Sequence, residues 1–477
     1  MVTRRAEGSE LIVVFVTSLL VASCTVGPNY TRPRIEMPSA YRDTTAVADA
    51  AQRESLADAQ WFDLFRDDLL TRIVNTALRQ NFDLRIAAER VLQARELLRI
   101  AHADRVPSVE EFISGSRSRR SEVGSVSPPP DADPQVSSIE AGFSVGWELD
   151  VWGRVRRLNE AARAQYLATE EARRGVVTTL VADVSQTYLR LRALDLQLEI
   201  ARRTRDLGID SLRLTELRRS RGVATSLDVR QAEQLLYTAT GQIASLEREA
   251  SQTENALSLL LGQVPGDVPR GQPLEAFEEP PTVPAGLPSS LLERRPDIRQ
   301  AEQELIAANA QIGVAKAEYF PRISLTGVFG GESRALADLL SAPARMWSIG
   351  ASTVAPIFNA GRTRANVRLA ESIQRELVVN YQRAVFSALR DVSDALAGYR
   401  KTSEQREQQE RLVEALRETS RLSTQRYEGG LDSYLQVLDA ERNRFQSELD
   451  LAALRQQELA AIVEVYRALG GGWTPLP

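Results

Sequence analysis

The sequence predicts a mixed α+β membrane protein, mostly helical, in which an internally duplicated chain contributes four strands to a β-barrel shared between copies. Three observations predict this fold class. Motifs recur in both halves at nearly constant offsets, which indicates a repeat. Two long stretches contain no proline, and a segment in each half alternates apolar with polar residues.

The duplication is visible in three motifs that are separated by 208 residues. These pairs are Asp183-Val184-Ser185 with Asp391-Val392-Ser393, Gly153-Arg154 with Gly361-Arg362, and the glycine-led segments that start at Gly222 and Gly430. Nearer the start of each half the offset is 214, as between Pro107 and Pro321, so the second half is six residues shorter between Pro321 and Gly361. The chain therefore consists of two similar halves.

Composition excludes several functions. The 477 residues carry a net charge of −5, which gives no basic surface for nucleic acid. One His, one Cys and three Met exclude a metal cluster of several His or Cys side chains. His102 has no partner acid or metal ligand in the sequence, and no phosphate-binding loop is present. We therefore expect no enzyme activity, no cofactor and no metal.

The N-terminus has the pattern of a targeting segment. Arg4 and Arg5 precede an apolar run over 11–22 that is too short to span a bilayer. The run ends in V-A-S-C, which resembles a bacterial lipoprotein lipobox, and this resemblance implies a signal peptide over 1–23 and lipidation of Cys24. A plain signal peptide with a chance cysteine is the alternative. The lipid-anchored N-terminal segment would cover 24–66.

Long helices follow from the absence of proline over 135–264 and 357–474, because proline breaks helices. Apolar residues recur there in alternating steps of three and four, the spacing of coiled coils. A helix over 154–219 would be on the order of 100 Å long at 1.5 Å per residue. The Gly222 and Gly430 segments interrupt these runs, so we expect each long helix to turn there and run back.

Two strands are expected in each half, ahead of the long helices. Residues 139–151 alternate strictly between apolar and polar side chains, and 347–357 do so less cleanly. Weaker partner strands precede them at 109–116 and 323–330, and exposed loops join each pair. We therefore expect each half to contain a helix, a β-hairpin and two long helices, in this order.

The apolar face of these strands has two explanations. It is the buried face of an ordinary sheet, or it faces lipid while the polar face lines a lumen. Little else in the sequence remains to cover it, which favours the second. Four strands cannot close a barrel and open edges are not tolerated in lipid, so copies must share one, and three chains would give twelve strands.

Six motifs in this order resemble the TolC-like outer-membrane efflux channels, in their lipoprotein (OprM/NodT-like) branch. They are C-T-V-G-P-N-Y-T-R-P from Cys24, W-F-D-L-F from Trp61, W-E-L-D-V-W-G-R from Trp147, R-R-P-D-I-R-Q-A-E from Arg294, A-P-I-F-N-A-G-R from Ala355, and R-Y-E-G-G-L-D-S-Y-L-Q-V-L-D-A-E from Arg426. The resemblance covers nearly all of the chain that follows the signal peptide. It implies a homotrimer with a twelve-stranded barrel in the outer membrane, continued by a long α-helical coiled-coil barrel across the periplasm.

The domain organisation follows from the repeat and the resemblance. Repeat 1 is expected over 67–270, a linker or equatorial segment over 271–294, and repeat 2 with the C-terminal tail over 295–477. The resemblance also implies the function: an outer-membrane channel that is the passive exit duct of a tripartite pump for drugs or other small toxic compounds. Its partners would be a periplasmic adaptor protein and a proton-driven inner-membrane efflux transporter.

The resemblance implies two groups of site residues at the periplasmic end. The two hairpin tips would contact the adaptor, through Gly222, Val223, Ser226 and Leu227 in the first and Gly430, Leu431 and Ser433 in the second. A gate would use Asp439 as an acid facing the channel axis, Tyr427 as the gate tyrosine and Leu435 as an apolar plug. The alternatives are a helix turn without a partner for the tips, a solvated acid for Asp439, and ordinary packing for Leu435.

Two positions depart from the family pattern. Gln436 stands where TolC has a second Asp, so a double acidic ring is not expected. Asp432 stands where TolC has an Arg, so a gate bond that uses this Arg is not expected either. Metal-ion efflux and type I protein secretion remain alternative cargoes, and a structural periplasmic coiled-coil lipoprotein is the alternative of a different class.

Overall fold

The computed structural model describes residues 25–39, 41, 67–121, 123, 133–277 and 288–471. The predicted signal peptide and Cys24 lie outside these residues. So does most of the predicted N-terminal segment, including the W-F-D-L-F motif.

Three helices of each half match in length. The first half contains α2 (Asp68–Gln80), α3 (Phe82–Ala103), α4 (Arg154–Ser220) and α5 (Ser226–Leu260). The second half contains α6 (Leu291–Arg294), α7 (Pro296–Ala317), α8 (Arg362–Glu428) and α9 (Tyr434–Ala468). Helices α3 and α7 both have 22 residues, α4 and α8 both have 67, and α5 and α9 both have 35. These pairs repeat the offsets of the sequence, although the proposed domain boundaries remain predictions.

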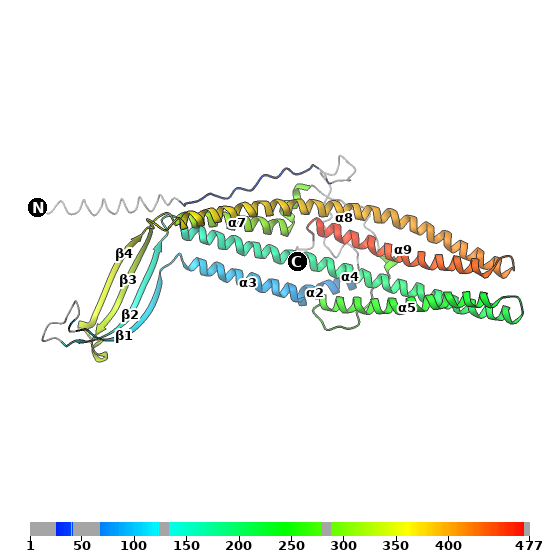
Figure 1. Cartoon of the computed structure of the whole chain (residues 1–477), viewed down its shortest axis with the longest axis horizontal. Coiled ribbons are helices and arrows are strands. Elements are labelled where there is room, and N and C mark those ends of the chain that lie inside the picture. The colour runs from blue at the N-terminus through cyan, green and yellow to red at the C-terminus, as the bar shows by residue number, and fades with distance from the viewer. Residues whose placement is uncertain are drawn as a thin grey trace. The chain divides into compact units, whose positions relative to one another are not determined.

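The strands form one antiparallel sheet in the order β1-β2-β3-β4 (Figure 1). The four strands are β1 (Ser108–Arg119), β2 (Gln135–Leu149), β3 (Arg322–Ser333) and β4 (Arg345–Val354). The two hairpins join through β2 and β3, whose register pairs Phe143 with Phe329. Both repeats thus contribute two strands to a single sheet, and β1 and β4 are its edges.

All four strands differ from the predicted ranges by a few residues, and two of the differences have a clear cause. Strand β4 ends at Val354 rather than at residue 357, because Pro356 cannot donate a ladder hydrogen bond. Strand β2 begins at Gln135, earlier than predicted, because its partner β1 continues to Arg119 and pairs with Gln135. Pairing with β1 thus sets the start of β2, and a proline sets the end of β4.

The register places most large apolar side chains of the sheet on one face. In adjacent strands Val145 lies opposite Val109, and Phe329 lies opposite both Phe143 and Trp347. Trp347 is 73% exposed and Ile349 is 84% exposed within the chain. The apolar face that the alternation predicts is therefore present and uncovered by the described residues.

The chain divides into two compact units, and each contains segments of both repeats. The first unit comprises the sheet and the adjoining helix ends, within 1–33, 92–168 and 301–380. The second comprises the remaining helical segments, within 34–91, 169–300 and 381–477. The duplication is thus a division of the sequence and not a division into two compact bodies.

In the first unit, the segment that follows Cys24 is fixed against helices α4 and α7. Val26 N donates to Trp152 O over 3.0 Å, and Asn309 Nδ2 donates to Pro28 O over 2.9 Å. Gly27 and Gly313 approach so closely that a Cβ on Gly27 would lie 2.5 Å from Gly313 Cα. This close backbone packing holds the segment beside the residues that connect β2 to α4.

The second unit is a set of long antiparallel helices in which α9 contacts both α4 and α8. Gln197 Nε2 on α4 donates to Leu449 O over 3.1 Å, and Gln409 Nε2 on α8 donates to Ser447 O over 3.0 Å. Among the described helices, none combines the length and the apolar character that a membrane span requires.

Candidate functional site: the tips of the two long hairpins

The two helix turns have the same backbone geometry. At the first, Gly222 has φ +74°, and Val223 N donates to Arg218 O over 2.9 Å. At the second, Gly430 has φ +75°, and Leu431 N donates to Arg426 O over 2.9 Å. Glycine tolerates positive φ at little cost, and the long bond back into the helix satisfies an end carbonyl. The prediction that the glycines reverse the chain is confirmed.

The turns differ in how their second helix begins. In the first tip Thr225 caps α5, because its Oγ1 accepts from Asp228 N and the Asp228 carboxylate accepts from Thr225 N. In the second tip Ser433 precedes α9 but its side chain makes no capping bond. Instead Arg426 at the end of α8 binds the Asp432 carboxylate, and this hydrogen bond lowers the pKa of Asp432. Ser226 is exposed in the first turn of α5.

Large apolar side chains are exposed at both tips. Val223, Leu227 and Leu431 are each about two thirds exposed, and Leu435 is about half exposed. All four are positions that the resemblance assigns to adaptor contact or to the gate. Exposed apolar groups beside a rigid turn can bind another helical hairpin, but within this chain nothing described covers them.

Tyr427 lies inside the chain rather than on its surface. It packs edge-to-face on Tyr434, with ring centroids 5.4 Å apart, in an apolar cluster with Ala232, Leu235, Val437 and Leu438. The Arg218 guanidinium lies over its ring, 4.6 Å from the centroid. Tyr427 therefore joins the two hairpins, and a gate role would act through this junction.

Arg218 and Tyr434 complete this cluster but were not singled out by the sequence. The Tyr434 hydroxyl hydrogen-bonds with Ser211 Oγ over 2.7 Å, and burial raises its pKa. Ser211 precedes Tyr434 by 223 residues, so no local pattern links them. The one available signal is that Tyr427 and Tyr434 are seven residues apart across the turn.

Asp439 lies one turn beyond Leu435 on the exposed side of α9. Its carboxylate accepts from Arg442 Nη2 over 3.0 Å and from Asn443 Nδ2 over 3.3 Å. Leu435 and Asp439 share one face, as a gate facing an axis requires. The neighbouring Arg442 offsets the negative charge of Asp439. This pairing was not part of the prediction from the sequence.

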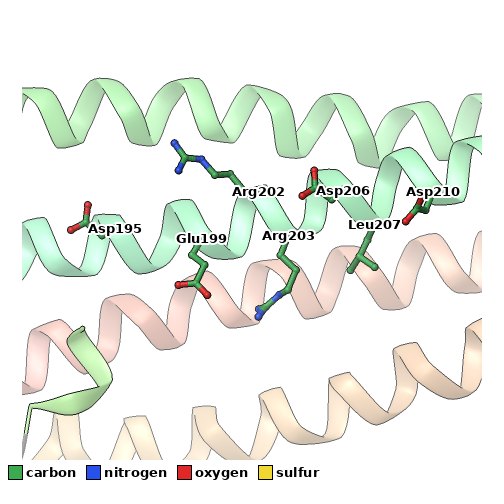
Figure 2. A pocket seen from close by; sticks show the side chains of 7 residues that line it. All are labelled: Asp195, Glu199, Arg202, Arg203, Asp206, Leu207 and Asp210. Carbon is green, nitrogen blue, oxygen red and sulfur yellow. The ribbon is translucent and has the colours of Figure 1, made fainter. Parts of the chain in front are cut away.

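Further along α4 a groove is lined by charged residues (Figure 2). Its lining consists of Asp195, Glu199, Arg202, Arg203, Asp206, Leu207 and Asp210. Figure 2 shows Glu199, Arg203 and Leu207 pointing from α4 toward α9. Arg203 binds Glu448 of α9 at 2.8 Å and Arg202 binds Glu247 of α5 at 3.0 Å, so these arginines tie α4 to both neighbours.

Comparison with known proteins defines the class of this protein. The family model described as outer membrane efflux protein matches residues 73–263 and 287–471. The chain therefore belongs to the outer membrane efflux protein family, as predicted.

Individual relatives agree with this assignment. The solvent efflux pump outer membrane protein SrpC of Pseudomonas putida is 39% identical, over 96% of this chain and 97% of the relative. The cation efflux system protein CusC of Escherichia coli O6:H1 (strain CFT073) is 36% identical, over 96% and 98%. The solved open state of the MtrE outer membrane channel of Neisseria gonorrhoeae has a TM-score of 0.84 at 31% identity, over 94% and 99%.

The predicted fold class and function are thereby confirmed. The chain is a mostly helical, duplicated protomer with four strands, and it is an outer-membrane channel protein of an efflux pump. The roles of the gate and tip residues remain predictions.

Proposed function

We propose that three copies of this chain form a passive exit duct, whose twelve strands close a barrel in the outer membrane. The observation that carries this proposal is the sheet with an uncovered apolar face. Its aromatic and aliphatic side chains match the outer surface of a lipid-embedded barrel, and its polar face matches a lumen.

The edges of the sheet support sharing between copies. Within the described chain β1 pairs only with β2, and β4 pairs only with β3. Unpaired backbone groups cost several kcal/mol each in lipid, so β4 of one copy must pair with β1 of the next. Closure removes all edges.

Adjacent residues of β4 test the face assignment. Ile349→Arg introduces a charge on the lipid-facing side, where it costs about 2–4 kcal/mol at the bilayer midplane. The matched control Ser348→Arg lies on the lumen side. We expect Ile349→Arg to reduce the trimer recovered from outer membranes while Ser348→Arg assembles normally, measured on native gels. Equal assembly of both variants would contradict the proposed barrel.

In the second unit, the tips would bind an adaptor and the α9 face would form the gate. The support is the exposure of Val223, Leu227 and Leu431 and the shared face of Leu435 and Asp439. Leu431→Asp should abolish export and adaptor binding without changing trimer yield. Asp432→Ala in the same turn is the control for general disturbance of the tip.

We propose that the cargo is small organic compounds. A proton-driven inner-membrane transporter would drive their export, together with a periplasmic adaptor. The support is that solvent and toluene efflux proteins of Pseudomonas putida are each 39% identical to this chain. The cation efflux relatives at 36% supply the alternative. Deleting the gene should lower tolerance to toluene more than tolerance to copper or silver, and the reverse order would favour metal export.

The chain itself would do no chemistry, and Cys24 would carry its lipid anchor. Thr25 packs on Gly153, since a Cβ there would lie 2.7 Å from Thr25 Cγ2, and Gly153 follows the end of β2 by four residues. Thr25, the residue after Cys24, thus lies where the sheet meets the helices, and this position supports an anchor at the bilayer surface. Mass spectrometry of the mature N-terminal peptide tests this, and an unmodified Cys24 would contradict it.

A further inference from the structure

In both repeats one residue separates two consecutive helices. It is Asn81 between α2 and α3 in the first repeat, and Arg295 between α6 and α7 in the second. Arg295 Nη1 donates to Ala468 O, at the end of α9, over 3.0 Å. Arg295 Nη2 donates to the Asp297 carboxylate over 2.6 Å and to the Asp391 carboxylate over 3.1 Å. One guanidinium therefore satisfies two carboxylates and a helix-end carbonyl.

The first repeat has a counterpart for every partner of this arginine but has an asparagine in place of the arginine itself. The two repeat offsets place Asn81, Asp83, Asp183 and Leu260 at the positions of Arg295, Asp297, Asp391 and Ala468. Asn81 Nδ2 still donates to Leu260 O over 2.9 Å, as Arg295 does to Ala468 O. Within the described chain, neither Asp83 nor Asp183 accepts a hydrogen bond or forms an ion pair.

A cavity lies where the guanidinium would be. All four corresponding residues line it, and Gly175, Val176 and Thr179 of α4 contribute small side chains. Its volume of about 410 Å³ is within the range of small-ligand sites. The location of the cavity and the loss of the arginine are independent observations that agree.

The charges around the cavity leave it negative. Burial is the main cause of a raised pKa of Asp183, and Glu464 adds to it. Arg467 opposes this shift but is itself bound to Glu464. Asp83 and Asp183 are both exposed and form no ion pair among the described residues, and the arginine that acts on Asp183 is bound to another acid.

We propose that this cavity binds the guanidinium group of a small organic cation. The planar head group would donate to the Asp83 and Asp183 carboxylates in the way that Arg295 donates to Asp297 and Asp391. Guanidinium suits the site because its donors form a fixed fork that matches two carboxylate acceptors. This site does not depend on the proposed duct function, because it is defined within one chain.

The test is calorimetric titration of the purified full-length protein in detergent with methylguanidinium. We expect saturable binding to wild type, weakened about tenfold or more by Asp183→Asn, since a charge-assisted hydrogen bond is lost. Asn81→Arg should abolish binding, because its own guanidinium would occupy the cavity as Arg295 does in the second repeat. Asp210→Asn, an exposed α4 acid at another position, should bind like wild type.

A second probe identifies the source of the cation. Acetyl-arginine methylamide carries the same head group on a peptide backbone. Weaker binding of this probe than of methylguanidinium supports a small free cation, whereas tighter binding would assign the site to an arginine of another polypeptide and overturn the small-molecule ligand. Absence of binding by both probes, or unchanged binding in Asp183→Asn, would overturn the site itself.

Discussion

The hairpins α4–α5 and α8–α9 have the same lengths and the same tip backbone, yet their returning helices are packed differently. Ten of the 35 residues of α5 are buried, and all ten are uncharged. Eighteen of the 35 residues of α9 are buried, and two of them are glutamates. Duplication therefore preserved the backbone while the environments of the two helices diverged.

The buried glutamates of α9 join three helices. Glu448 binds Arg203 of α4 at 2.8 Å, Arg417 of α8 at 2.7 Å and Arg444 of its own helix at 3.8 Å. Glu458 binds Arg406 of α8. In α5 the ion pair with Arg202 is exposed on both sides, where such pairs contribute little. Both returning helices thus bury an apolar seam, and in the second hairpin buried charge networks add to it.

The largest expected effect comes from the α9 network. Glu448→Ala leaves Arg203 and Arg417 without their carboxylate, whereas Arg444 keeps Glu441. It should destabilise the protein by about 2–3 kcal/mol, less than a fully buried pair because Arg203 and Arg417 are half exposed. Thermal unfolding in detergent measures this. The matched control is Thr240→Ala, 208 residues earlier on α5, with an expected cost of about 0.5 kcal/mol or less. Similar losses of stability in the two variants would contradict the proposed difference between α9 and α5.

The tip glycines should behave alike. Gly222→Ala and Gly430→Ala each force alanine into positive φ and should each cost about 1–2 kcal/mol. No atom lies within 4 Å of the added Cβ at either position, so strain in the backbone is the only cause. Hydrogen exchange at the turns measures local opening. Unequal costs would show that the two tips differ in backbone as well as in side chains.

The two tyrosines of the tip cluster sharpen the comparison further. Tyr434→Phe removes the hydrogen bond to Ser211 and should cost about 1 kcal/mol. Tyr427→Phe should be neutral or slightly stabilising, since the buried Tyr427 hydroxyl has no hydrogen-bond partner among the described residues. Unfolding temperatures of the two variants decide this. A larger loss for Tyr427→Phe would indicate that its hydroxyl is used in the assembled channel.

The smallest expected effect is the pH dependence of the second tip. Arg426 lowers the pKa of Asp432 in the folded chain, so this pair stabilises the turn above the ordinary pKa of an aspartate. The stabilisation is lost as the pH falls through the lowered value. The protection of the turn against hydrogen exchange, relative to an unfolded chain at the same pH, should therefore decrease at acidic pH in wild type and much less in Asp432→Asn. The first tip, where Thr225 and Asp228 form the cap, is the internal reference.

Part of the site was accessible from the sequence and part was not. Gly222 and Gly430 were found because positive φ has a local chemical cause. Tyr427 was found by resemblance, but its burial under Arg218 depends on a helix that is distant in the chain. Arg218 and Tyr434 were missed for the same kind of reason, since side-chain direction on a long helix follows from its neighbours. The pairing of Asp439 with Arg442 is local, because the two residues are three apart on α9, and their spacing could have predicted it.

The sequence by itself determined the repeat, the long helices and the alternating strands. Each of these follows from local rules: proline placement, the 3.6-residue helical period and the two-residue strand period. The tertiary structure decided where β2 begins and which of two equal helices has buried glutamates. It also revealed that Asn81 leaves the guanidinium position of the first repeat open. These features depend on partners that are far away in the chain, and a local pattern does not record them.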